Sequence, residues 1–118
     1  SQVRMTLERW FTAEFAADNA PVLDWIAEML RAADPEGFIG CCAAIRELSF
    51  RDRLGEISAP TLVIAGSEDA GTPPERGREI ADLIPGAGFA LIDGVSHLSN
   101  VQKASEFNAL MMPFLTGE

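Results

Sequence analysis

The stretch TLVIAG, residues 61–66, decides the fold of this chain. It is a short, continuous run of mostly apolar residues, and such a run is typical of a strand buried on both faces of a parallel sheet. FALID (89–93) is a second run of this kind. Between the two, Pro73 and Pro74 open a helical pattern, which PGAG (85–88) ends. A strand, a helix and a second strand in so short a span predict parallel neighbours with a right-handed crossover.

A last helix is expected to complete a βαβα unit. Its apolar positions at helical spacing are Phe107, Leu110, Met111, Phe114 and Leu115. Pro113 lies among them, and a proline inside a helix removes a backbone hydrogen bond at a cost of about 3 kcal/mol. We therefore expect a kink or an early end near Met112. The buried face of the middle helix is predicted to hold Ile80, Ala81, Leu83 and Ile84.

Residues 3–48 have helical spacing. We predict a helix over 3–18, a second helix capped by Asp18 or Asn19, a break at ADPEG (33–37) and a third helix. The apolar positions are Val3, Leu7, Trp10, Phe11 and Phe15, then Val22, Trp25, Ile26, Met29 and Leu30, then Phe38, Cys41, Cys42, Ile45 and Leu48. The predicted fold class is α/β, with a helical segment at 1–58 followed by a βαβα unit with two parallel strands at 59–118.

Composition excludes several classes of partner. The chain has 118 residues and a net charge of −9, with its acids spread along the sequence, which opposes binding to nucleic acid and to anionic membrane surfaces. No apolar run approaches the roughly 20 residues of a membrane span. The first ten residues lack the apolar centre of a signal peptide. Cys41 and Cys42 are adjacent and lack metal-type partners, and we expect them to be buried, reduced thiols in a cytoplasmic protein.

The loops after the two predicted strands carry the residues suited to catalysis. SEDAG follows the first strand and offers Glu68 and Asp69, while DGVSHLSN follows the second and holds His97, the single histidine. The carboxyl ends of neighbouring parallel strands lie at one edge of the sheet, so an acid and the histidine should meet there. A carboxylate bonded to one ring nitrogen fixes the tautomer of a histidine that acts as a base. The alternative role for Asp69 is that of a turn or capping acid before Pro73.

These residues resemble part of a known family. The pattern Gly66, Asp69, Pro73, Gly94 and His97, set after PTLVIAG, resembles the C-terminal end of an α/β-hydrolase. More narrowly, ERWFT, CCAAIRELSFRDRLGEISAPTLVIAGSEDAGTPPE and LIDGVSHLSNVQKASEFNALMMPFL resemble 3-oxoadipate enol-lactonases of the β-ketoadipate pathway for aromatic breakdown. The resemblance covers nearly the whole chain and implies the C-terminal half of such an enzyme, made of cap helices and the last two strands.

The resemblance implies roles for individual residues. Asp69 matches the acid of the catalytic triad, with neighbouring Glu68 as its rival, and His97 matches the base. The helices of 3–48 match the cap over the active site, and Trp10 matches a cap aromatic that faces the substrate, with plain core packing as its alternative. Arg46 is either a partner for a substrate carboxylate or a solvated side chain. No metal and no cofactor are implied.

The chain also departs from this family. The family's nucleophile is a serine in a G-x-S-x-G elbow, which these 118 residues lack, and GVSHL (94–98) fails at Leu98, where glycine is needed. The oxyanion donors of the family are missing too. The prediction is therefore a C-terminal fragment of a serine hydrolase acting on an enol-lactone, inactive alone. The alternatives are another cap-bearing hydrolase, such as a carboxylesterase, and a non-catalytic binding or assembly module derived from a hydrolase.

The strand edge predicts an assembly. In the family's strand order, residues 61–66 pair with a strand that these residues do not include. An unpaired apolar edge is a template for another chain. We expect a homodimer through this edge and the cap helices, with antiparallel pairing about a two-fold axis or an exchanged helix 3–18.

Overall fold

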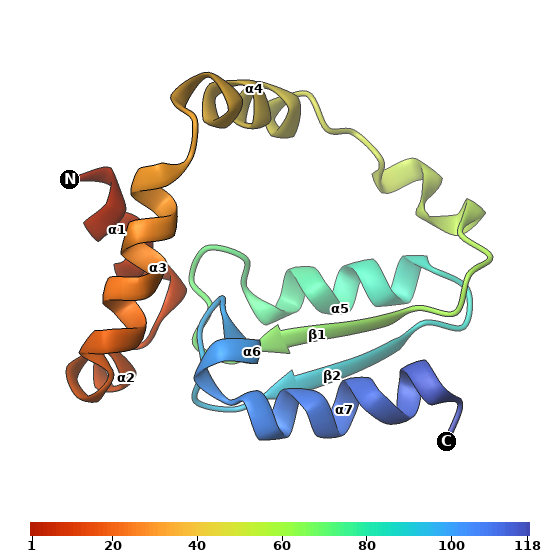
Figure 1. Cartoon of the computed structure of the whole chain (residues 1–118). Helices are drawn as coiled ribbons and strands as arrows, with labels where there is room; N and C mark the ends of the chain where they lie inside the picture. The colour runs from red at the N-terminus through yellow and green to blue at the C-terminus, as the bar shows by residue number, and fades with distance from the viewer.

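The computed structural model describes all residues, 1–118, as a helical segment followed by a βαβα unit (Figure 1). The elements are α1 (Gln2–Trp10), α2 (Ala13–Asp18), α3 (Ala20–Ala32), α4 (Pro35–Arg46), the short 3-10 helix η1 (Arg51–Glu56), β1 (Leu62–Gly66), α5 (Pro74–Leu83), β2 (Gly88–Ile92), α6 (Ser99–Gln102) and α7 (Ala104–Thr116). None of the helices combines the length and the apolar content needed to cross a lipid bilayer.

The two strands are parallel neighbours, which confirms the predicted fold class. Leu62 lies opposite Gly88, and the register continues to Gly66 opposite Ile92. Helix α5 packs on both strands and α7 packs on β2. Ile92 and Val95 are fully buried at the centre of this unit. The boundary between residues 58 and 59 remains a prediction; η1, on its N-terminal side, packs on α5.

The predicted single helix at 3–18 is wrong, because the chain breaks after Trp10. Phe11 is extended, with φ −128° and ψ 150°, and Thr12 begins α2 by accepting a hydrogen bond from Phe15 N–H at 3.3 Å. The break is stabilised by burial, since Phe11 is only 3% exposed and its ring stacks on Phe15 at 5.3 Å between centroids. Periodicity alone does not reveal this break, because the apolar positions keep their helical spacing across it.

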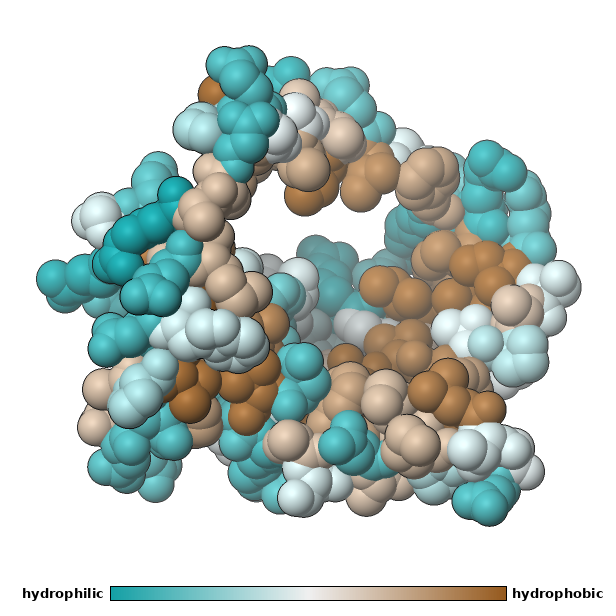
Figure 2. Space-filling view, in the orientation of Figure 1, coloured by the Kyte–Doolittle hydropathy of each residue, from teal (hydrophilic) through white to brown (hydrophobic).

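Helix α4 is exposed along its whole length, and the prediction that Cys41 and Cys42 are buried is wrong. Every residue from 31 to 50 is exposed, both cysteines included. The helix also begins earlier than predicted, at Pro35, because the Asp34 side chain accepts from Glu36 N–H and caps it. Figure 2 shows its apolar side chains facing an open hollow, with further apolar side chains on the opposite side.

Three smaller predictions also differ from the structure. Helix α7 does not end near Met112 but continues to Thr116. Pro113 lies inside the helix, and Gly117 closes it with φ +74° while its N–H donates to the Pro113 carbonyl. Ile80 is 42% exposed rather than buried, because it lines an open groove beside β1. Asn19 precedes α3 as predicted, yet its side chain donates to the Phe15 carbonyl instead of capping.

Candidate active site

The loops after β1 and β2 are pressed together at the carboxyl edge of the sheet. We define the histidine loop as Asp93–Leu98. Gly66 permits the contact, because a Cβ at this position would lie 2.5 Å from the carbonyl oxygens of both Val95 and Ser96. Glu68 N–H donates to the Val95 carbonyl at 2.9 Å and fixes the spacing of the loops. Only glycine fits this close approach of two backbones.

Asp69 and His97 meet across these loops. Nδ1 of His97 lies 2.8 Å from Oδ2 of Asp69. A carboxylate only accepts hydrogen bonds, so Nδ1 carries the hydrogen and Nε2 is left as the basic nitrogen. The Asp69 side chain is 7% exposed, whereas that of His97 is 41% exposed. A buried acid behind an accessible imidazole is the arrangement that orients a histidine for proton transfer.

The turn after Asp69 holds the carboxylate in its ionised form. Oδ1 accepts from Gly71 N–H at 3.0 Å and from Thr72 N–H at 2.9 Å, and the Thr72 hydroxyl donates to Oδ2 at 2.7 Å. Burial would raise the pKa of Asp69, but the hydrogen bonds from Thr72 and His97 outweigh it and the pKa lies below its ordinary value. Asp69 is thus both the turn-forming acid and the partner of His97. Sequence reasoning missed Thr72; an Asp followed three residues later by Thr in a turn was its signal.

The two rival charged residues lie away from this pair. Glu68 is exposed and its side chain has no hydrogen bond to His97. Arg46 is on α4, where it pairs with Glu47 at 3.4 Å and its side chain is 80% exposed. The structure therefore brings His97 together with Asp69 alone among the acids predicted for this role.

Trp10 lies beside the pair. Its ring stacks on that of His97, with 6.2 Å between centroids and an interplanar angle of 24°. Its carbonyl oxygen accepts from Leu98 N–H at 3.1 Å, and the neighbouring Arg9 carbonyl accepts from the Ser96 hydroxyl at 2.7 Å. Trp10 is half-buried against the histidine loop rather than within the helical core. Contact with a substrate stays a prediction.

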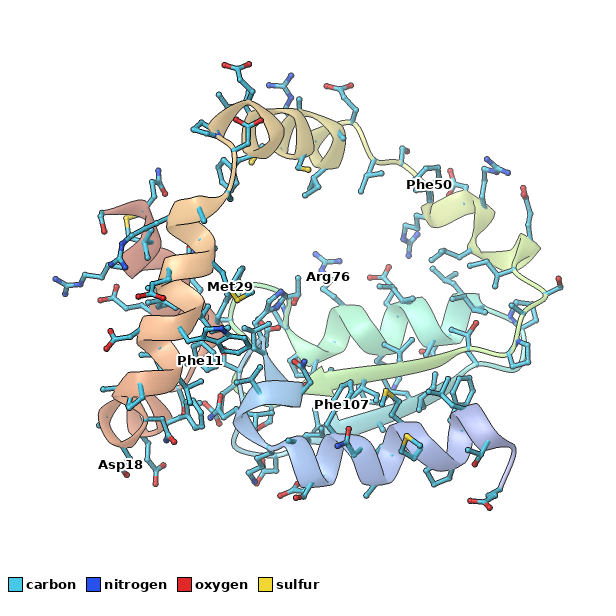
Figure 3. The ribbon with its side chains drawn as sticks, viewed as in Figure 1. Phe11, Asp18, Met29, Phe50, Arg76 and Phe107 are labelled. Atoms are coloured by element: carbon cyan, nitrogen blue, oxygen red, sulfur yellow. The ribbon has the colours of Figure 1, made fainter.

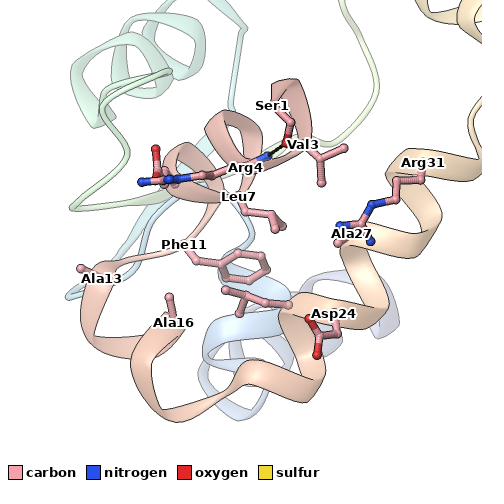
Figure 4. A pocket seen from close by; sticks show the side chains of 12 residues that line it. Ser1, Val3, Arg4, Leu7, Phe11, Ala13, Ala16, Asp24, Ala27 and Arg31 are labelled. Carbon is pink, nitrogen blue, oxygen red and sulfur yellow. Dashed lines mark hydrogen bonds and ion pairs between the residues drawn. The ribbon is translucent and has the colours of Figure 1, made fainter.

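A groove of about 310 Å³ adjoins the pair. Asp69, Thr72 and His97 line one end of it, and β1 and the first turns of α5 line the rest. Arg76 belongs to this lining and extends from α5 toward the hollow beneath α4 (Figure 3). A larger cavity of about 530 Å³ lies among α1, α2 and α3, around Leu7, Phe11 and Ala27 (Figure 4), and includes neither Asp69 nor His97. No cluster of three or more His, Cys, Asp or Glu side chains is placed to hold a metal ion.

Comparison with known proteins shows relatives along nearly the whole chain. No family model matches the sequence. A 3-oxoadipate enol-lactonase of Acinetobacter baylyi is 34% identical over 100 residues, which are 85% of this chain and 37% of that protein.

Solved structures are similar as well. The enol-lactonase from Burkholderia xenovorans superimposes with a TM-score of 0.94 and 35% identity, over 98% of this chain and 44% of that one. A thermophilic esterase from Thermogutta terrifontis has a TM-score of 0.89 and 26% identity, over 98% of this chain and 43% of that one. The chain thus spans less than half the length of the relatives it matches.

Proposed function

The chain belongs to the α/β-hydrolases, with the fold of the C-terminal half, and from this premise we propose that it carries the acid and the base of a serine hydrolase acting on 3-oxoadipate enol-lactone. His97 is the general base, Asp69 orients it and Trp10 contacts the substrate. The serine and the oxyanion donors come from residues outside these 118. The proposal needs no metal and no cofactor.

The reaction then proceeds in two halves. Nε2 of His97 takes the serine proton as the serine oxygen bonds to the lactone carbonyl carbon, and returns it to the enol oxygen as the ring C–O bond breaks. In the second half Nε2 takes a proton from water, whose oxygen attacks the acyl ester, and gives it back to the serine oxygen. Asp69 stays ionised throughout and stabilises the imidazolium. The product is a 3-oxo dicarboxylic acid.

The observation that carries the proposal is the 2.8 Å contact from His97 Nδ1 to Asp69 Oδ2, which leaves Nε2 free at an accessible ring. Of the two hydrolase candidates, the lactonase is favoured by the identity and overlap with lactonases along nearly the whole chain. A carboxylesterase is the second candidate, supported by the overlap with an esterase. A non-catalytic module is the third candidate, and no contact in the site favours it.

The test uses the complete gene product. His97→Ala and Asp69→Asn should each lower kcat by about 10⁴-fold. His97→Ala removes the base, and Asp69→Asn removes the carboxylate that fixes the tautomer of His97. Glu68→Gln is the matched control: it neutralises the adjacent, exposed carboxylate and should leave kcat unchanged. Equal losses in Asp69→Asn and Glu68→Gln would refute the assignment.

Substrate choice is tested separately with the same protein. The ratio of kcat/KM for the enol-lactone to kcat/KM for an aryl ester should favour the lactone. A ratio in favour of the ester would replace the lactonase by the carboxylesterase. Absence of turnover with both, in a protein that folds, would favour the non-catalytic module.

We also propose a second copy of the chain as a partner. The outer edge of β1 has no strand beside it, and α4 exposes the large apolar side chains Phe38, Ile39 and Ile45. Unpaired edges and apolar patches of this kind are covered in stable assemblies. The proposed homodimer of residues 1–118 forms through the β1 edge and the cap helices; in the complete gene product, the family's strand order places a further strand of the same chain beside β1.

A further inference from the structure

Two segments far apart in the sequence meet next to His97. Arg9–Thr12 spans the end of α1 and the break before α2, and the histidine loop follows β2. The carbonyls of Arg9 and Trp10, at the C-terminal end of α1, have no partner within that helix and accept from the histidine loop instead. The position of the Trp10 ring therefore depends on contacts with the loop that carries His97.

Gln102, the last residue of α6, places its side-chain amide between these two segments. Toward the helices, Oε1 accepts from Thr12 N–H at 3.5 Å and Nε2 donates to the Thr12 hydroxyl at 2.6 Å. Toward the histidine loop, Oε1 accepts from Ser96 N–H at 3.3 Å and Nε2 donates to the Gly94 carbonyl at 3.3 Å. The amide NH₂ group thus donates to both segments, and the amide oxygen accepts from both segments.

We propose that Gln102 is a positioning residue, which ties the end of α1 to the histidine loop and thereby holds the Trp10 ring against His97. The effect on turnover rests on the function proposed above, whereas the effect on the stacking of the two rings does not. Gln102 touches neither the reacting atoms nor Asp69, and it acts through Thr12, Ser96 and Gly94.

The neighbours of Gln102 explain why loss of its side-chain amide would change the positions of Trp10 and His97. Ser96 is 4% exposed, so its N–H has no access to water as a replacement acceptor. Thr12 lies at the break between α1 and α2, where its N–H has no backbone partner and bonds only to Gln102. Without Gln102, the two segments are tied only by the bonds from the Ser96 hydroxyl to the Arg9 carbonyl and from Leu98 N–H to the Trp10 carbonyl. With fewer ties the two rings can shift relative to each other, and a displacement of about 1 Å near the chemistry lowers turnover by up to about 10²-fold.

The experiment compares matched variants in the complete gene product. Gln102→Leu keeps the size of the side chain and removes all four hydrogen bonds. Thr12→Val removes the hydroxyl that accepts from Gln102 and that also caps α2 by accepting from Phe15 N–H, and Thr12→Ser restores both hydrogen bonds. Lys103→Met is the control, because Lys103 donates to the Asp93 carbonyl at 2.9 Å in the same loop but has no bond to Arg9–Thr12.

Two readouts follow each variant. The first is the ¹⁹F resonance of Trp10 in protein labelled with 5-fluorotryptophan. This resonance is assigned as the signal that disappears in Trp10→Phe. His97→Asn removes the imidazole ring, so it gives the resonance position of an unstacked Trp10. Gln102→Leu and Thr12→Val should move the resonance toward that position, while Thr12→Ser and Lys103→Met should not. The second readout is turnover: kcat should fall by about tenfold to 10²-fold in Gln102→Leu, with a smaller change in KM.

The outcomes separate this inference from the proposed function. A Trp10 resonance that stays at the wild-type position in both Gln102→Leu and Thr12→Val overturns the inference, whatever the substrate. A resonance that moves in a protein without lactone turnover supports the positioning role and refutes the proposed function. If Gln102→Leu does not fold, Thr12→Val and its Thr12→Ser rescue decide the question by the same resonance.

Discussion

The substitution Gly66→Ala tests whether the close approach of the two loops builds the site. A Cβ at residue 66 would lie 2.5 Å from the carbonyl oxygens of Val95 and Ser96, and both are backbone atoms that cannot rotate away. An ordinary contact requires the histidine loop to move by about 0.5–0.9 Å, since packed interiors leave no slack. Overpacking of this kind costs about 1–3 kcal/mol of unfolding free energy.

The same displacement changes the site, because His97 follows Ser96 directly in the chain. A shift approaching 1 Å is expected to lower kcat by about tenfold to 10²-fold, since the proton donor and acceptor leave their aligned geometry. Urea denaturation measures the stability of the complete gene product, and steady-state turnover of the enol-lactone measures kcat.

Gly40→Ala is the control substitution. Gly40 lies inside α4, and a Cβ there meets nothing within 4 Å. Alanine is the better helix former by about 0.8–1 kcal/mol, so this variant should be slightly more stable and equally active. A Gly66→Ala protein with the stability and kcat of Gly40→Ala would refute the view that loop contact at Gly66 positions His97.

Thr72→Val should lower the unfolding free energy by about 1.5–3 kcal/mol, because it removes a hydroxyl that donates to a carboxylate; it should also raise the pKa of Asp69 toward its ordinary value. Urea denaturation measures the first effect and ¹³C titration of Asp69 the second, and Thr72→Ser should show neither. Because the pKa of Asp69 is lowered in the fold, its contribution to stability is complete above pH 3.8 and is lost as the pH falls through the folded-state value. Asp69→Asn should therefore be less acid-sensitive in this range, and unchanged acid sensitivity would contradict the carboxylate's role. Residues 1–118 alone should not hydrolyse activated esters, since each missing oxyanion donor is worth about 10²–10³ in rate; turnover that His97→Ala abolishes would disprove this. Sedimentation of residues 1–118 should give a dimer, and a compact monomer at high concentration would argue against pairing through β1.

The sequence alone determined the βαβα unit and the meeting of Asp69 with His97. Both follow from local patterns: TLVIAG and FALID are short apolar runs of the kind that form strands buried in a parallel sheet. Parallel neighbours must place their C-terminal loops at one edge, so the acid and the histidine were paired without any knowledge of side-chain contacts. The parallel direction of the two strands is enough to predict that Asp69 and His97 lie close together.

Tertiary structure alone decided how this pair is supported. Thr72 and Gln102 read as ordinary polar residues in the sequence, and their roles appear only where a turn and a distant helix end approach them. The break after Trp10 and the exposure of Cys41 were likewise beyond the sequence, because helical spacing specifies an apolar face but not which partner covers it. Burial and hydrogen bonding between distant segments depend on how the helices and strands pack together. The spacing of residues within one helix or strand does not specify that packing.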